Sequence, residues 1–177
     1  GDTDFSSISN NEIHSCQNGI LLNEAGNNDL LGNTIYNIDE YGIAVLRGGV
    51  VGGADIQVDS NTIHHCGING IRLEDGSDNS ISSNTIYECG GAGIVIDEQS
   101  DVQLRYNQVF SNALDIGAPA GVLVTNNSEN AELHFNQISD NGSNLGGYVA
   151  ALTIQGIAST FNQVVVNGNT ISDDYGN

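Results

Sequence analysis

The sequence lacks lysine, methionine and tryptophan altogether, and its 177 residues include only one proline and three arginines. Against 22 aspartates and glutamates, this gives a formal net charge of −19. Such a surface repels nucleic acid and anionic membranes, and also bare anionic glycans unless a cation bridges them. No apolar run reaches the length of a membrane span. We therefore expect no nucleic-acid partner and no membrane insertion.

What the sequence does contain is a repeat, of which Asn61-Thr62-Ile63-His64 is typical. An Asn-x-Ile/Val unit recurs at intervals of 22 to 33 residues, which is the signature of a solenoid. The asparagines are Asn11, Asn33, Asn61, Asn84, Asn107, Asn136 and Asn169.

Each repeat contains three strand patterns. Positions −3 and +2 from the asparagine are always aliphatic, and a third strand follows a glycine, as in Gly70-Ile71-Arg72-Leu73. Within each strand the alternation has period two, which predicts that one face is buried. The glycine is expected to turn with positive φ. The asparagines are expected to hydrogen-bond to one another in a ladder between coils.

These repeats resemble the right-handed parallel β-helix repeat of the pectate-lyase-like superfamily over essentially the whole chain. The resemblance implies an all-β fold, a right-handed parallel β-helix (solenoid) of about seven coils of three short strands each. It indicates function less sharply, because the superfamily includes lyases, glycosidases, epimerases, tailspikes, adhesins and surface-layer proteins. Since Gly1 falls inside a repeat, residues 1–177 are predicted to be a single domain that is a processed chain or a piece of a larger one.

Position +3 carries a ring in five consecutive repeats and is predicted to face outward on one sheet. Stacked rings offer a platform for sugar rings, and in the enzymes that the fold resembles, a groove along one sheet holds the polysaccharide. The alternative is that the rings only stabilise adjacent strands. The predicted glycan platform is His14, Tyr36, His64, Tyr87 and Phe110.

A row of aspartates at position −6 is a candidate calcium site, formed by Asp55, Asp78 and Asp101. Stacked carboxylates repel one another, and hard cations such as Ca²⁺ bind oxygen clusters of this type. Alternatively, each aspartate caps its own turn. No histidine metal site is predicted, because His64 and His65 are expected to diverge.

The three cysteines share position +5, which is predicted to be small and buried: Cys16, Cys66 and Cys89. Free thiols that act as small hydrophobes are favoured over a disulfide between Cys66 and Cys89. A nucleophilic cysteine is not expected, because no base lies nearby in the repeat.

No complete catalytic set is visible in the sequence. Related lyases use a lysine or arginine base and related epimerases a lysine, but this chain has no lysine, and Arg47, Arg72 and Arg105 fall in different parts of the repeat. Related glycosidases use two acids on one sheet. The acids near the ring column, which do not form a facing pair, are Glu12, Glu88, Asp140 and Asp173.

Two features predict self-association. Neither chain end carries a cap pattern, so either flanking sequence is missing or rods stack end to end. The outward positions of the middle strand are mostly apolar, which indicates a covering segment, a lateral partner or self-association. These positions are Leu21, Ala44, Arg72, Val95 and Leu123.

The sequence therefore predicts a non-catalytic extracellular or cell-surface rod, structural or adhesive, that stacks into a filament or fibre and contacts polysaccharide. The alternative is a polysaccharide-active hydrolase, lyase or epimerase, or a fragment of one.

Overall fold

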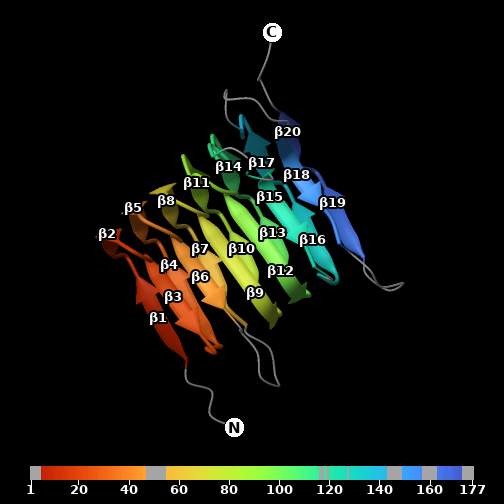
Figure 1. Ribbon diagram of the computed structural model, residues 1–177. Helices are drawn as coiled ribbons and strands as arrows, with labels where there is room; N and C mark the ends of the chain where they lie inside the picture. The colour runs from red at the N-terminus through yellow and green to blue at the C-terminus, as the bar shows by residue number, and fades with distance from the viewer. Residues whose placement is uncertain are drawn as a thin grey trace.

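The computed structural model describes residues 5–46, 55–115, 118, 120–126, 128–142, 149–156 and 163–172. Over these residues the chain forms strands and turns without a helix, wound into a parallel β-helix (Figure 1). Accordingly, the described residues contain no helix long and apolar enough to cross a membrane. Arg47 and Asp173 lie outside the described residues.

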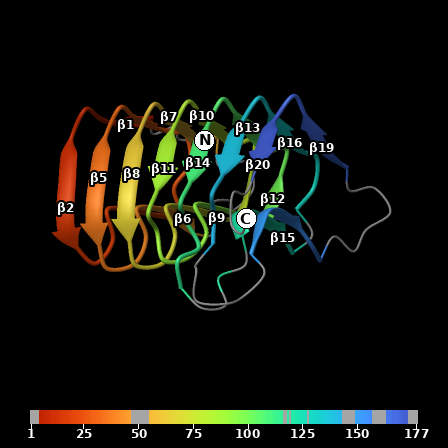
Figure 2. The ribbon, with the colours of Figure 1, turned by 90° about the horizontal axis from the view of Figure 1, so that it is seen from above.

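Three parallel sheets form the walls, two of seven strands and one of six. In sheet A the strands are β1 (Ser6–Ser9), β4 (Asn28–Leu31), β7 (Gln57–Asp59), β10 (Ser80–Ser82), β13 (Gln103–Arg105), β16 (Ala131–His134) and β19 (Val164–Asn167). Sheet B, whose strands lie side by side in Figure 2, contains β2 (Glu12–Cys16), β5 (Thr34–Ile38), β8 (Thr62–Cys66), β11 (Thr85–Tyr87), β14 (Gln108–Phe110), β17 (Gln137–Ser139) and β20 (Thr170–Ser172). Sheet C contains β3 (Ile20–Asn23), β6 (Ile43–Leu46), β9 (Ile71–Ser77), β12 (Ile94–Ser100), β15 (Ala120–Thr125) and β18 (Ala150–Ile154).

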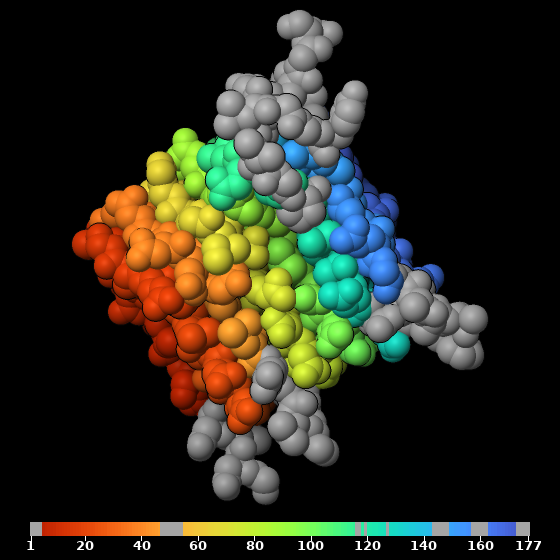
Figure 3. All heavy atoms as spheres, viewed as in Figure 1, coloured from red at the N-terminus to blue at the C-terminus, as the bar shows by residue number. Residues whose placement is uncertain are grey.

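The predicted repeat positions set the register of the sheets. Ile63 pairs with Ile35 on one side and with Ile86 on the other, so each column of the sequence becomes a row of neighbours. Successive coils appear as successive bands of colour in the space-filling view (Figure 3). The prediction of about seven coils of three strands is confirmed.

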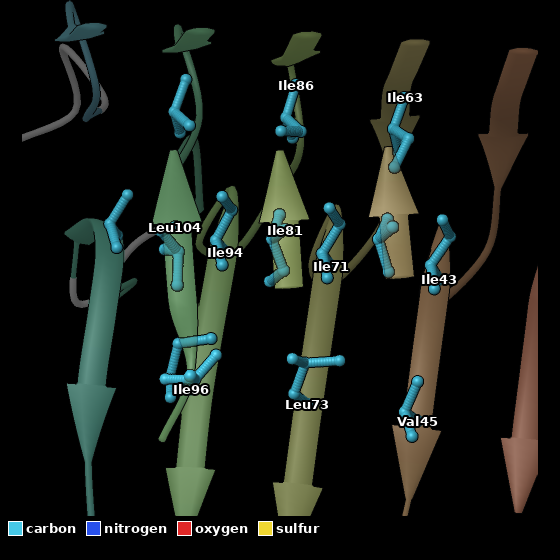
Figure 4. Close-up of a cluster of buried hydrophobic side chains, with 14 of the residues drawn as sticks. Ile43, Val45, Ile63, Ile71, Leu73, Ile81, Ile86, Ile94, Ile96 and Leu104 are labelled. Atoms are coloured by element: carbon cyan, nitrogen blue, oxygen red, sulfur yellow. The ribbon is translucent and has the colours of Figure 1, made fainter. Parts of the chain in front are cut away.

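Aliphatic side chains from all three sheets fill the interior (Figure 4). Ile43, Ile63, Ile81 and Ile86 are fully buried, and their equivalents in neighbouring coils pack above and below them. In the last coil the equivalent Ile171 is 47% exposed, because no further coil covers it among the described residues.

The asparagine ladder is confirmed and is continuous through all seven coils. The Asn61 side-chain amide donates to Asn84 Oδ1 at 3.0 Å, and that of Asn84 donates to Asn107 Oδ1 at 3.1 Å. The Asn84 amide also donates to the carbonyl of Val58 at 2.8 Å, so the side chain satisfies backbone groups at the bend between sheets A and B. A shorter ladder, which the sequence analysis missed, joins Asn112 to Asn141 at 3.2 Å.

The glycines before the sheet C strands are needed for a different reason from the one predicted. Gly42, Gly70 and Gly93 do not adopt positive φ. Instead, consecutive coils approach so closely that a Cβ on Gly70 would lie 2.7 Å from the carbonyl oxygen of Gly93. The expectation of a left-handed turn here was wrong, and the constraint is lack of space.

The cysteines are free, as expected, with Cys66 and Cys89 buried and Cys16 half-buried. A side-chain hydrogen bond with Cys89, followed by burial, raises the pKa of the Cys66 thiol. Its thiolate is therefore disfavoured, and the position serves packing rather than nucleophilic chemistry.

Candidate functional site

The five rings predicted at position +3 form one continuous stack across β2, β5, β8, β11 and β14. Their centroids are 5.0 Å apart for His14 and Tyr36, and 5.3 Å for Tyr36 and His64. The stack continues at 4.7 Å to Tyr87 and at 5.2 Å to Phe110. Neighbouring planes are within 21° of parallel, so the rings repeat with the spacing of the strands. We call these five residues the ring ladder.

The ladder presents ring edges rather than ring faces to solvent. Each inner ring has a parallel ring next to both of its faces, so these faces are occupied inside the ladder. The edges carry polar atoms, namely the imidazole nitrogens of His14 and His64 and the hydroxyls of Tyr36 and Tyr87. A ligand lying along sheet B therefore meets a row of hydrogen-bonding groups at regular intervals.

An acidic side chain of sheet B holds one ring of the ladder in place. The Tyr36 hydroxyl donates to Glu12 Oε1 at 2.8 Å. This hydrogen bond, with smaller contributions from burial and from the charge of Glu12, raises the pKa of Tyr36. The phenol therefore stays protonated and its orientation is fixed.

The side chains of His64 and His65 were predicted from the sequence to diverge, but in the structure they lie against each other. Their Nδ1 atoms lie 2.7 Å apart, and His65 Nε2 lies 3.2 Å from Glu88 Oε2. The backbone explains the error, because His65 has φ of 54° and its side chain turns back toward its neighbour. The three side chains form a row of close polar contacts, and a hydrogen bond between the two imidazoles requires one Nδ1 to donate and the other to accept.

This arrangement favours the neutral form of His64. Burial, and then the charge of His65, lower the pKa of His64, and the carboxylate of Glu88 opposes this only in part. A neutral imidazole paired with a second imidazole and a carboxylate is able to accept or donate a proton near neutral pH.

The aspartate row lies at the turns that lead into sheet A. Asp78 and Asp101 adopt positive φ of 56° and 53°. Asp78 accepts a hydrogen bond from the adjacent Ser77 Oγ at 2.9 Å, and Asp101 accepts one from Asn130 Nδ2 of the next coil at 3.0 Å. Asp55 is exposed on the preceding coil. Within the part of the chain that the structure describes, no three His, Cys, Asp or Glu side chains are grouped to hold a metal ion.

Sheet C carries an ion cluster that was not predicted from the sequence, where acid pairs were expected only near the rings. Arg72 Nη2 contacts Glu74 Oε2 at 2.9 Å and Asp97 Oδ2 at 2.7 Å. Asn126 Nδ2 donates to the other oxygen of Asp97 at 2.6 Å. Glu74 and Asp97 are register partners on β9 and β12, which is the signal that would have found them. Arg72 thus contacts two carboxylates.

The outward apolar stripe of sheet C is largely covered within the chain. Ala44, Val95 and Leu123 are buried, and only Leu21 of the apolar members is exposed. Of the explanations offered above, this burial fits a covering segment better than an open lateral interface.

The comparison with protein families settles the fold family. Residues 1–171 match the family described as "Right handed beta helix region". The chain belongs to this family. The right-handed sense of the coil expected from the resemblance is thereby confirmed for this β-helix. A search of curated proteins found no match.

Several solved structures share the fold of this β-helix at low sequence identity. The Azotobacter vinelandii mannuronan C-5 epimerase AlgE6 A-module superposes with a TM-score of 0.71 and 17% identity, covering 97% of this chain and 52% of that one. A double mutant of the periplasmic alginate epimerase AlgG gives 0.66 and 17%, covering 93% and 45%. The enzymatically active domain of bacteriophage CBA120 tailspike protein 2 gives 0.56 and 13%, covering 73% and 27%. The chain thus spans about half or less of each of these proteins, and the likeness shows the fold alone.

Proposed function

We propose that this β-helix is the polysaccharide-contacting part of a polysaccharide-active protein, with the glycan lying along the ring ladder of sheet B. The observation that carries the proposal is the unbroken stack of five rings at 4.7–5.3 Å spacing. That interval is comparable to the rise of one pyranose in an extended (1→4)-linked chain. Each sugar residue would therefore meet an equivalent set of polar ring edges.

The geometry of the ladder determines which non-covalent contacts a bound sugar would make. Because the faces of the inner rings are occupied, sugar hydroxyls would hydrogen-bond to the imidazole nitrogens and phenolic oxygens at the ring edges. The carbon atoms of the same edges would exclude water between these hydrogen bonds. The neighbours with the same fold include epimerases of mannuronan and alginate and a tailspike domain with enzymatic activity, which favours a polysaccharide ligand. They also favour the enzymatic alternative over the non-catalytic rod expected from the sequence.

Catalysis is the second candidate function, and the chain of His64, His65 and Glu88 favours it. His65 would exchange a proton with a bound sugar, and Glu88 Oε2, which lies 3.2 Å from His65 Nε2, would orient the imidazole. The group adjoins the ladder at its third and fourth rings, where a bound chain would pass. An arrangement of this kind suits proton transfer, and it needs no lysine.

Binding is tested by affinity measurements with mannuronan and with a neutral (1→4)-linked glucan. We expect at least one polymer to bind, and Tyr87→Ala to weaken its binding about tenfold or more, because the substitution interrupts the ladder. Gln137→Ala, an exposed change on the same sheet beyond the ladder, is the matched control. Equal affinity of both variants for the bound polymer, or no binding of either polymer, would refute the proposal.

Catalysis is tested separately by incubating the bound polymer and following its length and stereochemistry by NMR. Glu88→Gln and His65→Gln are expected to abolish any turnover while leaving the affinity within about threefold of wild type. If the polymer is unchanged, the protein is a non-catalytic rod that binds polysaccharide, as first expected from the sequence. An extracellular or envelope location accords with both versions, since one neighbour is periplasmic and another is a phage tailspike.

A further inference from the structure

A second surface lies at the corner between sheets A and B, on the coils that contain β13 and β16. Arg105, Tyr106, His134 and Phe135 line an open pocket of about 240 Å³ there. Tyr106 and Phe110, the last ring of the ladder, are four residues apart, which is on the order of 10 Å along the chain. None of the four lining residues belongs to the ladder, so the pocket is a second surface.

The two aromatic residues occupy a position that the fold makes unfavourable for them. The residue before each ladder asparagine has positive φ in every coil, and Tyr106 and Phe135 have φ of 58° and 56°. Bulky side chains rarely adopt this backbone conformation. In the other coils small or short polar residues fill the position: Asn10, Gly32, Ser60, Ser83 and Gly168. Backbone strain of this kind points to a functional demand on the side chain.

Unlike the inner rings of the ladder, Tyr106 keeps a free face. Its ring stacks on Phe135 at a centroid distance of 5.4 Å with planes 10° apart. On the opposite side the equivalent residue is Ser83, which has no ring to cover it. Tyr106 is 60% exposed and Phe135 is 53% exposed. The far side of Phe135 is closed by the backbone of Gly168, where a Cβ would lie 2.6 Å from the ring.

Arg105 supplies a hydrogen-bond donor without an acceptor. Its Nη2 contacts Glu132 Oε2 at 3.1 Å, but its Nε is buried and has no hydrogen-bond partner among the described residues. Such a buried donor is costly unless something accepts its hydrogen. The same Glu132 oxygen lies 3.5 Å from His134 Nε2, so one carboxylate faces two cation-capable groups.

Among the described residues, the charge distribution favours this pocket as a place to hold an anionic group. The chain has three arginines and no lysine, and Arg72 already contacts the carboxylates of Glu74 and Asp97. Arg105 has one carboxylate partner, and guanidinium groups bind a second carboxylate well because their donors form a fork. The negative charge of Glu132 opposes an incoming anion, and His134 offsets it in part when protonated.

We propose that this pocket binds a carboxylated sugar residue. The pyranose lies on the free face of Tyr106, and its carboxylate accepts hydrogen bonds from the Nη end of the Arg105 guanidinium. That side chain is 43% exposed, although its Nε is buried. The site lies outside the ladder, so a glycan chain or branch that carries uronate residues would be recognised at two separate places on the rod. On a surface that otherwise repels anions, this pocket would select for the acidic sugar.

The test uses disaccharides, which would meet only two rings of the ladder at a time. NMR titration of the full chain with dimannuronate is expected to shift the ring signals of Tyr106 and Phe135 and the guanidinium signals of Arg105, whereas cellobiose leaves them unchanged. Arg105→Gln should weaken dimannuronate binding about tenfold or more. Glu132→Gln should strengthen it severalfold, because the opposing charge is removed. No shifts with dimannuronate, or equal binding of cellobiose, would overturn the proposal.

Glycine substitutions separate binding from folding. Tyr106→Gly relieves the strained backbone and should leave the melting temperature within about 3 °C of wild type while abolishing dimannuronate binding. Ser83→Gly makes the same backbone change one coil earlier and should not affect binding. Tyr87→Ala, which interrupts the ladder, should leave disaccharide binding intact, so that failure of the ladder and failure of the pocket are distinguished. Retained binding in Tyr106→Gly would overturn the proposal.

Discussion

The Nδ1 atoms of His64 and His65 lie 2.7 Å apart, so that one imidazole donates and the other accepts. Protonation of both rings would place two donors against each other and break the contact. The ladder therefore contains a pH-sensitive contact at its third ring, His64, which lies between Tyr36 and Tyr87.

The first prediction concerns pH. The pKa of His64 is lowered from 6.5, first by burial and then by His65. Just below pH 6.5 the unfolded chain therefore binds more protons at this site than the folded chain, and stability falls as the pH drops through this window. His64→Tyr keeps a ring in the ladder but cannot protonate. We expect chemical denaturation from about pH 8 to about pH 5 to show a smaller loss of stability for this variant; parallel curves would contradict the assignment.

The second prediction concerns the glycines that let the coils approach. Gly70→Ala would push a methyl group against Ile86 and the carbonyl of Gly93. Overpacking of this kind costs about 1–3 kcal/mol. Urea unfolding of Gly70→Ala measures this cost, with the half-buried Thr85→Ala on neighbouring β11 as a control. If the free energy of unfolding changes no more than in the control, the added methyl group fits between the coils without strain.

The third prediction concerns the asparagine ladder. Asn84→Ala removes the side-chain acceptor of the Asn61 backbone amide at 2.9 Å and the donor to the Val58 carbonyl at 2.8 Å. Both groups would be left buried without a partner, and we expect a loss of at least about 2 kcal/mol. Gln108→Ala, an exposed substitution in the next coil, should change the free energy of unfolding by less than about 0.5 kcal/mol. Comparable losses of stability in the two variants would mean that water hydrogen-bonds to the Asn61 amide and the Val58 carbonyl in place of the Asn84 side chain.

The fourth prediction concerns calcium at Asp55, Asp78 and Asp101, which stays a prediction from the sequence. If Ca²⁺ bridges the row, it should raise the melting temperature more than Na⁺ at matched ionic strength, and Asp78→Asn should remove the difference. Asp101 accepts a hydrogen bond from Asn130 of the next coil. The alternative is that each aspartate caps its own turn and binds no cation. In that case chelator leaves the melting temperature unchanged.

The repeat could be predicted from the sequence because its signals are local and periodic. Asn61 and Ile63 recur with their neighbours in every coil, and parallel stacking converts the columns into ladders. The contact between His64 and His65 could not be predicted, because it depends on a left-handed backbone at His65. The corner pocket was within reach: Tyr106 and Phe135 stand out where other coils carry Gly, Ser or Asn. The buried, unpaired Nε of Arg105 needs coordinates.

The dependence of affinity on oligosaccharide length tests the central claim most directly. A five-ring ladder predicts that affinity for the bound polymer type rises steadily from dimer to about pentamer and then levels off, since each added sugar meets one more ring until the ladder ends. In Tyr87→Ala, which separates Phe110 from the first three rings, the rise should stop near the trimer. Affinity that is independent of length, or a length profile unchanged in Tyr87→Ala, would contradict binding along the ladder.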